Sequence, residues 1–206
     1  MIPFLLDGPS DAEITIALAH GAGAPMDSPF MAKAARALAA HGFRVARFEF
    51  PYMHARRAGG GRGAPDRPAI LKETWLEAVR ALGADRLVIG GKSMGGRIAS
   101  MIADEAKADG LVCFGYPFHP PGAPERLRTA HLENLATPAL ILQGTRDSFG
   151  TPDDVKGYAL SRSIRVVWVP EGDHSFKPRA KSGRTEADNL ALAFETAADF
   201  VRGLVP

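Results

Sequence analysis

Ser93 has the sequence surroundings that most directly indicate chemistry. It is the centre of the pentapeptide GKSMG (residues 91–95), which follows the apolar run RLVIG and precedes a segment with helical spacing. A sharp strand-to-helix turn exposes a serine hydroxyl on a strained backbone, and glycines two positions to either side avoid collisions with neighbouring elements. The pattern predicts a nucleophilic serine. The alternative is a tight turn whose serine only caps the helix.

Two later residues could activate this serine. A serine hydroxyl is unreactive at neutral pH unless an imidazole accepts its proton and a carboxylate orients that imidazole. Asp147 comes shortly after the apolar run PALILQG, and His174 comes shortly after IRVVWVP. Both follow predicted strands, in the chain order serine, acid, histidine. We therefore expect Ser93, Asp147 and His174 to form a catalytic triad.

Other acids and histidines are alternatives to this pair. Asp153 and Asp154 lie in TPDD, which resembles the cap and first turn of a helix, and Asp173 is the immediate neighbour of the histidine. Adjacent residues rarely orient each other's side chains well, so Asp147 is the preferred acid. Surface or structural positions are expected for three other histidines: His41, His54 and His131.

The tetrahedral intermediate of acyl transfer also needs hydrogen-bond donors for its oxyanion. One donor would be the backbone N–H of Met94, directly after the serine. The second would come from the turn HGAG (residues 20–23), with the N–H of Ala22 preferred and that of Gly23 as the alternative. His20 is expected to fix this turn by hydrogen bonds rather than to act in catalysis.

Short apolar runs alternate with amphipathic segments along the whole chain. Near-continuous hydrophobicity is typical of strands that are covered on both faces of a parallel sheet. The strands are expected at residues 14–20, 43–50, 85–91, 110–116, 138–144 and 164–170, with 2–6 as a candidate edge strand. Helices are expected over 28–42 and 66–83, after residue 94 and from residue 185. This alternation predicts one three-layer α/β domain over residues 1–206, with a mostly parallel sheet of about six or seven strands.

Composition excludes several classes of function. The chain has 206 residues, 46% of them hydrophobic, and a formal net charge of +2, so nothing global favours nucleic-acid or membrane binding. The first residues lack the basic and apolar regions of a signal peptide, and the single cysteine, Cys113, lies in an apolar run. A soluble, cytoplasmic protein is expected. Neither metal-binding motifs nor a dinucleotide fingerprint are recognised, so no metal and no cofactor are predicted.

The substrate would be bordered by loops. No large insertion follows residues 110–116, so no cap domain is expected and the pocket should be shallow. Three residues at the end of that strand are candidate pocket walls: Tyr116, Phe118 and His119.

The segment 54–68 is rich in Gly, Pro and Arg and is predicted to be a long, mobile loop. Its arginines are Arg56, Arg57, Arg62 and Arg67. One interpretation is a solvated basic loop, and the sharper hypothesis is that Arg56 or Arg57 closes over an anionic substrate. Lys92 and Arg97, beside the serine, could add positive potential.

Taken together, HGAG, GKSMG, the strand-end aspartate and GDH (172–174) resemble the α/β-hydrolase superfamily over nearly the whole chain. More narrowly, FEFPYM (48–53), GYPFHPPGAPERLRTAHL (115–132) and KSGRTEADN (181–189) are similar to the cap-less branch near dienelactone hydrolases. In that branch the resemblance is to testis-expressed protein 30 and the hydrolase-like domain of NSL complex subunit three. True dienelactone hydrolases are expected to carry a cysteine where this chain has Ser93, which argues against dienelactone as the substrate.

The resulting hypothesis is a serine hydrolase that cleaves an ester or thioester of a small acyl group through an acyl-enzyme. An amidase or a peptidase would need the same residues. A different class of function is a protein-interaction module on the same fold, with little or no catalytic activity. An intact triad argues against that alternative, because a relic would be free to lose it.

Overall fold

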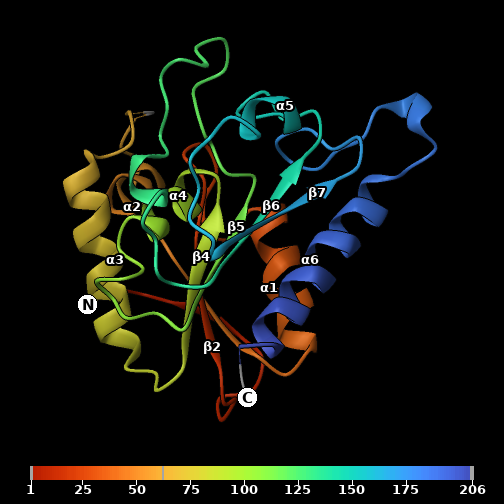
Figure 1. Cartoon of the computed structure of the whole chain (residues 1–206). Helices are drawn as coiled ribbons and strands as arrows, with labels where there is room; N and C mark the ends of the chain where they lie inside the picture. Colours follow the sequence, from red (N-terminus) through yellow and green to blue (C-terminus); the bar gives the residue numbers. More distant parts are fainter. Residues whose placement is uncertain (1, 62, 205–206) are drawn as a thin grey trace.

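The computed structural model describes residues 2–61 and 63–204, and one seven-stranded sheet runs through it (Figure 1). The strand order is β1-β3-β2-β4-β5-β6-β7, with β1 antiparallel to β3 and the other pairs parallel. The strands are β1 (Leu5–Asp7), β2 (Thr15–Ala19), β3 (Arg44–Phe48), β4 (Leu87–Lys92), β5 (Gly110–Phe114), β6 (Ala139–Gly144) and β7 (Ile164–Val169). The predicted α/β class, the mostly parallel sheet and the edge strand are confirmed.

The apolar runs are continuous because the central strands are covered on both faces. Every residue of β2, β4, β5 and β6 is buried. The edge strand β7 is different, since its residues are mostly half-buried and it pairs along one side with β6. Cys113, in β5, is buried as expected.

Helices lie on both faces of the sheet, which makes three layers (Figure 1). Helices α1 (Pro29–Ala40) and α6 (Glu186–Arg202) pack against each other on one face, where Leu38 and Phe194 belong to one apolar core. Helices α3 (Pro68–Leu82) and α4 (Met94–Ser100) cover the other face, where Trp75 and Ile98 belong to a second core. Shorter elements are α2 (Pro51–Arg57), α5 (Pro152–Val155), η1 (Ala130–Leu132) and η2 (Ala180–Ser182).

Several helix ends follow the local signals. The Thr185 side chain accepts from the Asp188 N–H and the Asp188 carboxylate accepts from the Thr185 N–H, so the capping box of α6 is confirmed. Gly83 ends α3 in the left-handed conformation, with φ of 53°. Ser28 occupies the N-cap position of α1, but its side chain makes no capping hydrogen bond.

The arginine-rich segment differs from its prediction. The first part of 54–68 is not a loop, because His54 and Arg57 belong to α2. Pro51 occupies the first position of this helix, and the Asp66 carboxylate accepts a hydrogen bond from the Tyr52 N–H at 2.9 Å. The segment therefore folds back on itself. Arg62 lies outside the described residues.

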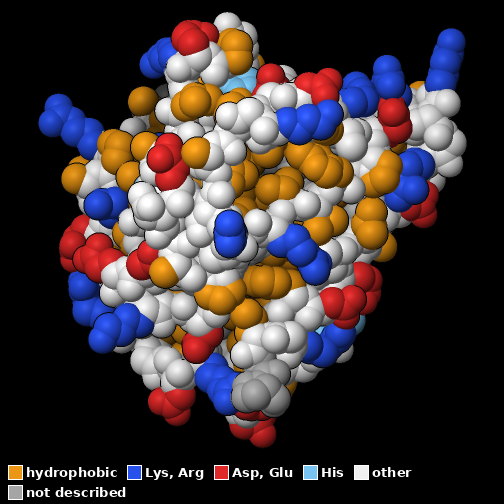
Figure 2. Space-filling view, in the orientation of Figure 1, with side chains coloured by type: hydrophobic (Ala, Val, Ile, Leu, Met, Phe, Trp, Pro, Cys, Tyr) orange, Lys and Arg blue, Asp and Glu red, His pale blue; other side chains and the backbone are white. Residues whose placement is uncertain are grey.

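The connection between β5 and β6 is long, at residues 115–138, but contains no cap domain. Between β5 and β6 the described chain forms turns and the three-residue η1, without a helical cap. In the part of the chain that the structure describes, no helix is both long and apolar enough to cross a bilayer. Lys and Arg side chains lie among Asp and Glu side chains over the face in Figure 2, rather than forming one basic surface.

Candidate active site

The turn after β4 holds Ser93 in a conformation that few non-glycine residues adopt. Its φ is 51° and its ψ is −114°, and its N–H donates to the Phe114 carbonyl of β5 at 3.0 Å. A Cβ on Gly91 or Gly95 would lie 2.1 or 2.2 Å from the Ala19 carbonyl oxygen in β2. Only glycine fits there, so the GKSMG pattern arises from close backbone packing around an exposed hydroxyl.

The structure brings Ser93 together with the two residues expected to activate it. His174 Nε2 lies 2.8 Å from Ser93 Oγ, and His174 Nδ1 lies 2.8 Å from Asp147 Oδ2. The three residues follow the carboxyl ends of β4, β6 and β7. With Nδ1–H donating to the carboxylate, Nε2 is the free acceptor for the serine proton. This arrangement can generate a serine nucleophile.

Asp147 is fully buried, and both of its carboxylate oxygens accept hydrogen bonds. Oδ1 accepts from the Phe149 N–H at 2.9 Å, while Oδ2 accepts from Gln143 Nε2 at 2.9 Å and from His174. Gln143 also exchanges hydrogen bonds with the backbone of Tyr116, its Oε1 accepting from the N–H and its Nε2 donating to the carbonyl. Gln143 was not among the residues predicted for the site. Gln143 is a polar residue inside the otherwise apolar strand β6. Because a buried amide needs hydrogen-bond partners, this position could have indicated a role in the site.

The imidazole of His174 is packed as well as hydrogen-bonded. The Phe149 ring lies against it, with ring centroids 4.2 Å apart. Burial lowers the pKa of His174 below its usual 6.5, while the hydrogen bond to Asp147 acts in the opposite direction. The positive charge of Lys92 lowers this pKa further.

These effects predict the acidic limb of any activity that uses His174 as a base. Since the base must be neutral, kcat/KM should fall with decreasing pH at an apparent pKa below 6.5. In a Lys92→Met variant, the limb should move to higher pH, because one positive charge near the imidazole is gone. A pH–rate profile measures both shifts. A limb above 6.5 in the unmodified protein would contradict the assignment.

Lys92 is a buried cation beneath this site. Its Nζ donates to the His174 carbonyl at 2.6 Å and lies 5.6 Å from the centre of the Phe30 ring. Burial lowers its pKa to about 8, although Asp147 and Asp173 act in the opposite direction. Lys92 therefore anchors the loop that carries the histidine, at a cost in stability.

Lys92→Met should increase the free energy of unfolding at pH 7 by about 1–4 kcal/mol, because the lowered pKa means that the charged lysine is unfavourable in the folded protein, and one pKa unit corresponds to about 1.4 kcal/mol. The stability gained in Lys92→Met should shrink between about pH 8 and 10.5, because Lys92 loses its proton at lower pH in the folded protein than in the unfolded chain. Denaturant unfolding across that pH range is the measurement. The control is Lys177→Met, at an exposed lysine. A stability difference between Lys92→Met and the unmodified protein that does not change with pH would contradict the lowered pKa of Lys92.

The HGAG turn lies beside the serine. A Cβ on Gly21 would lie 3.7 Å from Ser93 Cβ, and Ala22 lines the same cavity as Ser93 and Met94. Gly23 is not among the lining residues, so Ala22 fits the oxyanion role better. His20 is buried, with Nδ1 donating to the Gly21 carbonyl and Nε2 accepting from the Phe50 N–H, which fits the expected structural role.

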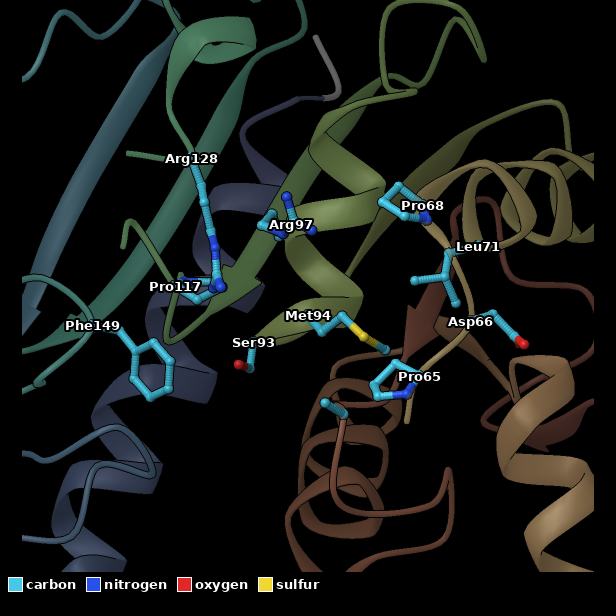
Figure 3. Close-up of a pocket in the computed structure, with 11 residues that line it drawn as sticks. Pro65, Asp66, Pro68, Leu71, Ser93, Met94, Arg97, Pro117, Arg128 and Phe149 are labelled. Carbon is cyan, nitrogen blue, oxygen red and sulfur yellow. The ribbon is translucent and has the colours of Figure 1, made fainter. Parts of the chain in front are cut away.

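A cavity of about 390 Å³ opens at Ser93 (Figure 3). Its apolar lining consists of Ala22, Pro65, Pro68, Leu71, Met94, Pro117 and Phe149. Arg97 and Arg128 add two cations, and Asp66 adds one carboxylate on the side of α3.

The residues predicted to form the pocket wall do not line the cavity. Tyr116 and Phe118 are fully buried and His119 nearly so, and Pro117 faces the cavity in their place. The Phe118 N–H donates to the Tyr116 carbonyl at 3.1 Å, which closes a tight turn centred on Pro117, so Pro117 reaches the cavity while its two neighbours stay buried. His119 Nδ1 donates to the Pro120 carbonyl, and its Nε2 lies 3.7 Å from Asp154.

The arginines singled out in α2 also lie outside the cavity lining. Arg57 is held by Glu49 and Asp27. Arg56 donates to the Ala22 carbonyl at 3.4 Å, with its guanidinium 5.0 Å from the centre of the Tyr52 ring. Arg56 thus contacts the HGAG turn, while Arg57 is tied into an ion-pair network.

The competing acids and histidines have structural partners. Asp154 forms the capping box of α5 with Thr151, and the Asp173 carboxylate accepts from two backbone N–H groups of its own turn. His131 lies 2.8 Å from the Ser100 hydroxyl, and burial lowers its pKa to about 4. His41 lies 3.2 Å from Glu195. These contacts favour structural roles.

Within 2–61 and 63–204, no group of three or more His, Cys, Asp or Glu side chains is arranged to hold a metal ion.

Comparison with solved structures gives the same architecture. A lidless α/β serine hydrolase from Xanthomonas campestris aligns with a TM-score of 0.71 at 22% identity, over 100% of this chain and 90% of that one. Dienelactone hydrolase from Anabaena variabilis aligns with a TM-score of 0.72 at 20% identity, over 98% and 91%. Est1E from Butyrivibrio proteoclasticus aligns with a TM-score of 0.73 at 13% identity, over 99% and 94%. At these identities, the likeness concerns the fold.

The family assignment rests on the sequence as well as on the fold. The model of the alpha/beta hydrolase domain family matches residues 12–202, which includes every element from β2 to α6 and all three residues of the Ser93–His174–Asp147 arrangement. The chain therefore belongs to the alpha/beta hydrolase domain family.

Proposed function

We propose that this hydrolase is a serine hydrolase that cleaves an ester or thioester of a small acyl group. The observation that carries the proposal is the continuous hydrogen-bonded arrangement of Ser93, His174 and Asp147, with two contacts of 2.8 Å, on a strained turn. The shallow cavity at Ser93 supports a small substrate. The lidless serine hydrolase among the similar structures supports the same class of reaction.

Acylation would begin with proton transfer. His174 Nε2 takes the hydroxyl proton while Ser93 Oγ bonds to the carbonyl carbon and the carbonyl electron pair moves to oxygen. The tetrahedral intermediate then collapses, and the bond to the alcohol or thiol breaks. The leaving group receives the proton from His174, while Asp147 stabilises the transient imidazolium.

Deacylation would repeat these steps with water as the nucleophile. Water gives a proton to His174 and bonds to the acyl carbon; the bond between that carbon and Ser93 Oγ then breaks, His174 returns the proton to Oγ, and the carboxylic acid leaves. The backbone N–H groups of Met94 and Ala22 would hold the oxyanion in both halves of the reaction. A single well-placed donor of this kind contributes roughly 3–4 kcal/mol to transition-state stabilisation.

Labelling with a fluorophosphonate probe tests the proposal directly. The probe should modify the unmodified protein at Ser93 and should not modify Ser93→Ala. A panel of 4-nitrophenyl esters and acyl thioesters would then define the preferred acyl group. Absent labelling, or labelling that persists in Ser93→Ala, would instead favour an interaction module on this fold.

Four finer points stay predictions from the sequence. They are the single-domain organisation over 1–206, the cytoplasmic location, the preference for esters and thioesters over amides, and the closer resemblance to testis-expressed protein 30 and the domain of NSL complex subunit three.

A further inference from the structure

Two arginines, Arg97 and Arg128, line the cavity at Ser93 (Figure 3). Arg97 comes from α4, one helical turn after the serine, and its N–H donates to the Ser93 carbonyl at 3.0 Å. Residues four apart on a helix are surface neighbours, so the start of the Arg97 side chain lies next to the serine. Arg128 comes from the segment that follows β5. Two distant parts of the chain thus direct cations to one cavity.

The backbone of Arg128 is fixed on both sides. Its N–H donates to the Phe118 carbonyl at 2.8 Å, and its carbonyl accepts from the Tyr116 hydroxyl at 3.0 Å. Tyr116 and Phe118, which were expected to line the pocket, therefore contribute indirectly, because their hydrogen bonds hold the backbone from which the Arg128 side chain extends.

Neither guanidinium has an acidic partner among the described residues, although each side chain is half-buried. By contrast, the buried Arg47 is paired with Asp7 and the exposed Arg57 with Glu49. Burial lowers the pKa of Arg128, and the nearby positive charge of Arg97 lowers it further.

The remaining neighbours do not neutralise the pair. Burial and the charge of Arg97 lower the pKa of His131 to about 4, so it is uncharged at neutral pH. Asp66, the acidic lining residue, lies beside Leu71 on the α3 side in Figure 3 and accepts from the Tyr52 N–H. The side of the cavity near Arg97 and Arg128 therefore carries two positive charges that a bound anion would compensate.

We propose that Arg97 and Arg128 bind an anionic group of the substrate, a carboxylate or a phosphate, so that the enzyme prefers esters that carry a negative charge close to the scissile bond. This inference rests on the proposed hydrolase function and adds the substrate class. Guanidinium groups suit such ligands because their planar fork matches carboxylate and phosphate oxygens. The cavity volume of about 390 Å³ suits a small acid.

Two matched ester pairs test the preference and locate the charge. Mono-4-nitrophenyl glutarate and 4-nitrophenyl pentanoate differ in charge on the acyl side. For the alcohol side, 4-butyryloxybenzoate is compared with its methyl ester. In at least one pair, kcat/KM should favour the anionic ester by about 10- to 100-fold, as charge-assisted hydrogen bonds provide. That ratio should fall below about threefold in Arg97→Gln/Arg128→Gln.

The control is Arg126→Gln, which removes an exposed cation from the same segment. It should leave the ratio unchanged. A preference for the neutral ester in both pairs, or a preference for the anion that survives in the double variant, would overturn the proposal.

A binding measurement separates this proposal from the function on which it rests. If none of the four esters is hydrolysed and the fluorophosphonate does not label Ser93, the hydrolase function fails. Calorimetry with glutarate and with inorganic phosphate still tests the anion site. At least one of them should bind about tenfold or more weakly to the double variant than to the unmodified protein or to Arg126→Gln. Equal binding of an anion to all three proteins, or no binding of either anion, would contradict the proposed anion site.

Discussion

Ser93→Ala should lower kcat/KM for ester hydrolysis by roughly 10⁴- to 10⁶-fold, the range typical of triad serines. Within the described lining of the cavity, Ser93 carries the one hydroxyl group, so a neighbour cannot replace it. The measurement is the initial rate with a 4-nitrophenyl ester. Thermal unfolding should show that the variant still folds, because the substitution removes one oxygen from a half-buried side chain.

The same mechanism predicts how the acid behaves. Asp147→Asn should lower kcat by about 10⁴-fold, because an amide NH2 facing His174 Nδ1 favours the wrong tautomer of the imidazole. Combining it with Ser93→Ala should add little, since the residues act as a unit. Asp153→Asn, at an exposed carboxylate, is the matched control. Activity within tenfold of the unmodified protein in either single variant would refute the mechanism.

The second large effect concerns the turn itself. A Cβ on Gly95 would lie 2.2 Å from the Ala19 carbonyl oxygen and 2.6 Å from the His20 carbonyl oxygen. Both atoms belong to backbone at the end of β2, where the HGAG turn begins. Gly95→Ala should therefore cost about 3 kcal/mol or more of unfolding free energy, as overpacking against rigid backbone does.

Denaturant unfolding measures this cost, and Gly203→Ala is the control. A Cβ on Gly203 meets its nearest atoms at 3.5 Å and the residue has a φ of −70°, so its stability change should stay within about 0.5 kcal/mol. If Gly95→Ala folds as stably as the control, the close approach of α4 to β2 is not rigid.

The strands and the order of the proposed triad could be predicted because each depends on a short stretch of sequence. The runs that became β2, β4, β5 and β6 are apolar throughout because both sheet faces are covered. GKSMG was informative because Gly91 and Gly95 satisfy a steric demand that other residues fail.

The surroundings of the site were harder to predict, because side-chain direction depends on the three-dimensional path of each loop. Pro117 rather than Tyr116 faces the cavity, because the chain makes a tight turn centred on Pro117. Arg128 gave no local signal, since its position depends on hydrogen bonds to residues near the end of β5. α2 was missed because its apolar face is short and a glycine-rich stretch follows it.

The position of β7 at the border of the sheet has a consequence for heat inactivation. His174 follows this half-buried strand, whereas Ser93 and Asp147 follow strands in the buried interior. Peripheral segments with fewer buried contacts open locally at lower free energy than the interior. Local opening of β7 would move His174 away from Ser93, while Ser93 would keep its position. We therefore expect the opening of β7 to limit the temperature range of activity, ahead of the melting of the whole domain.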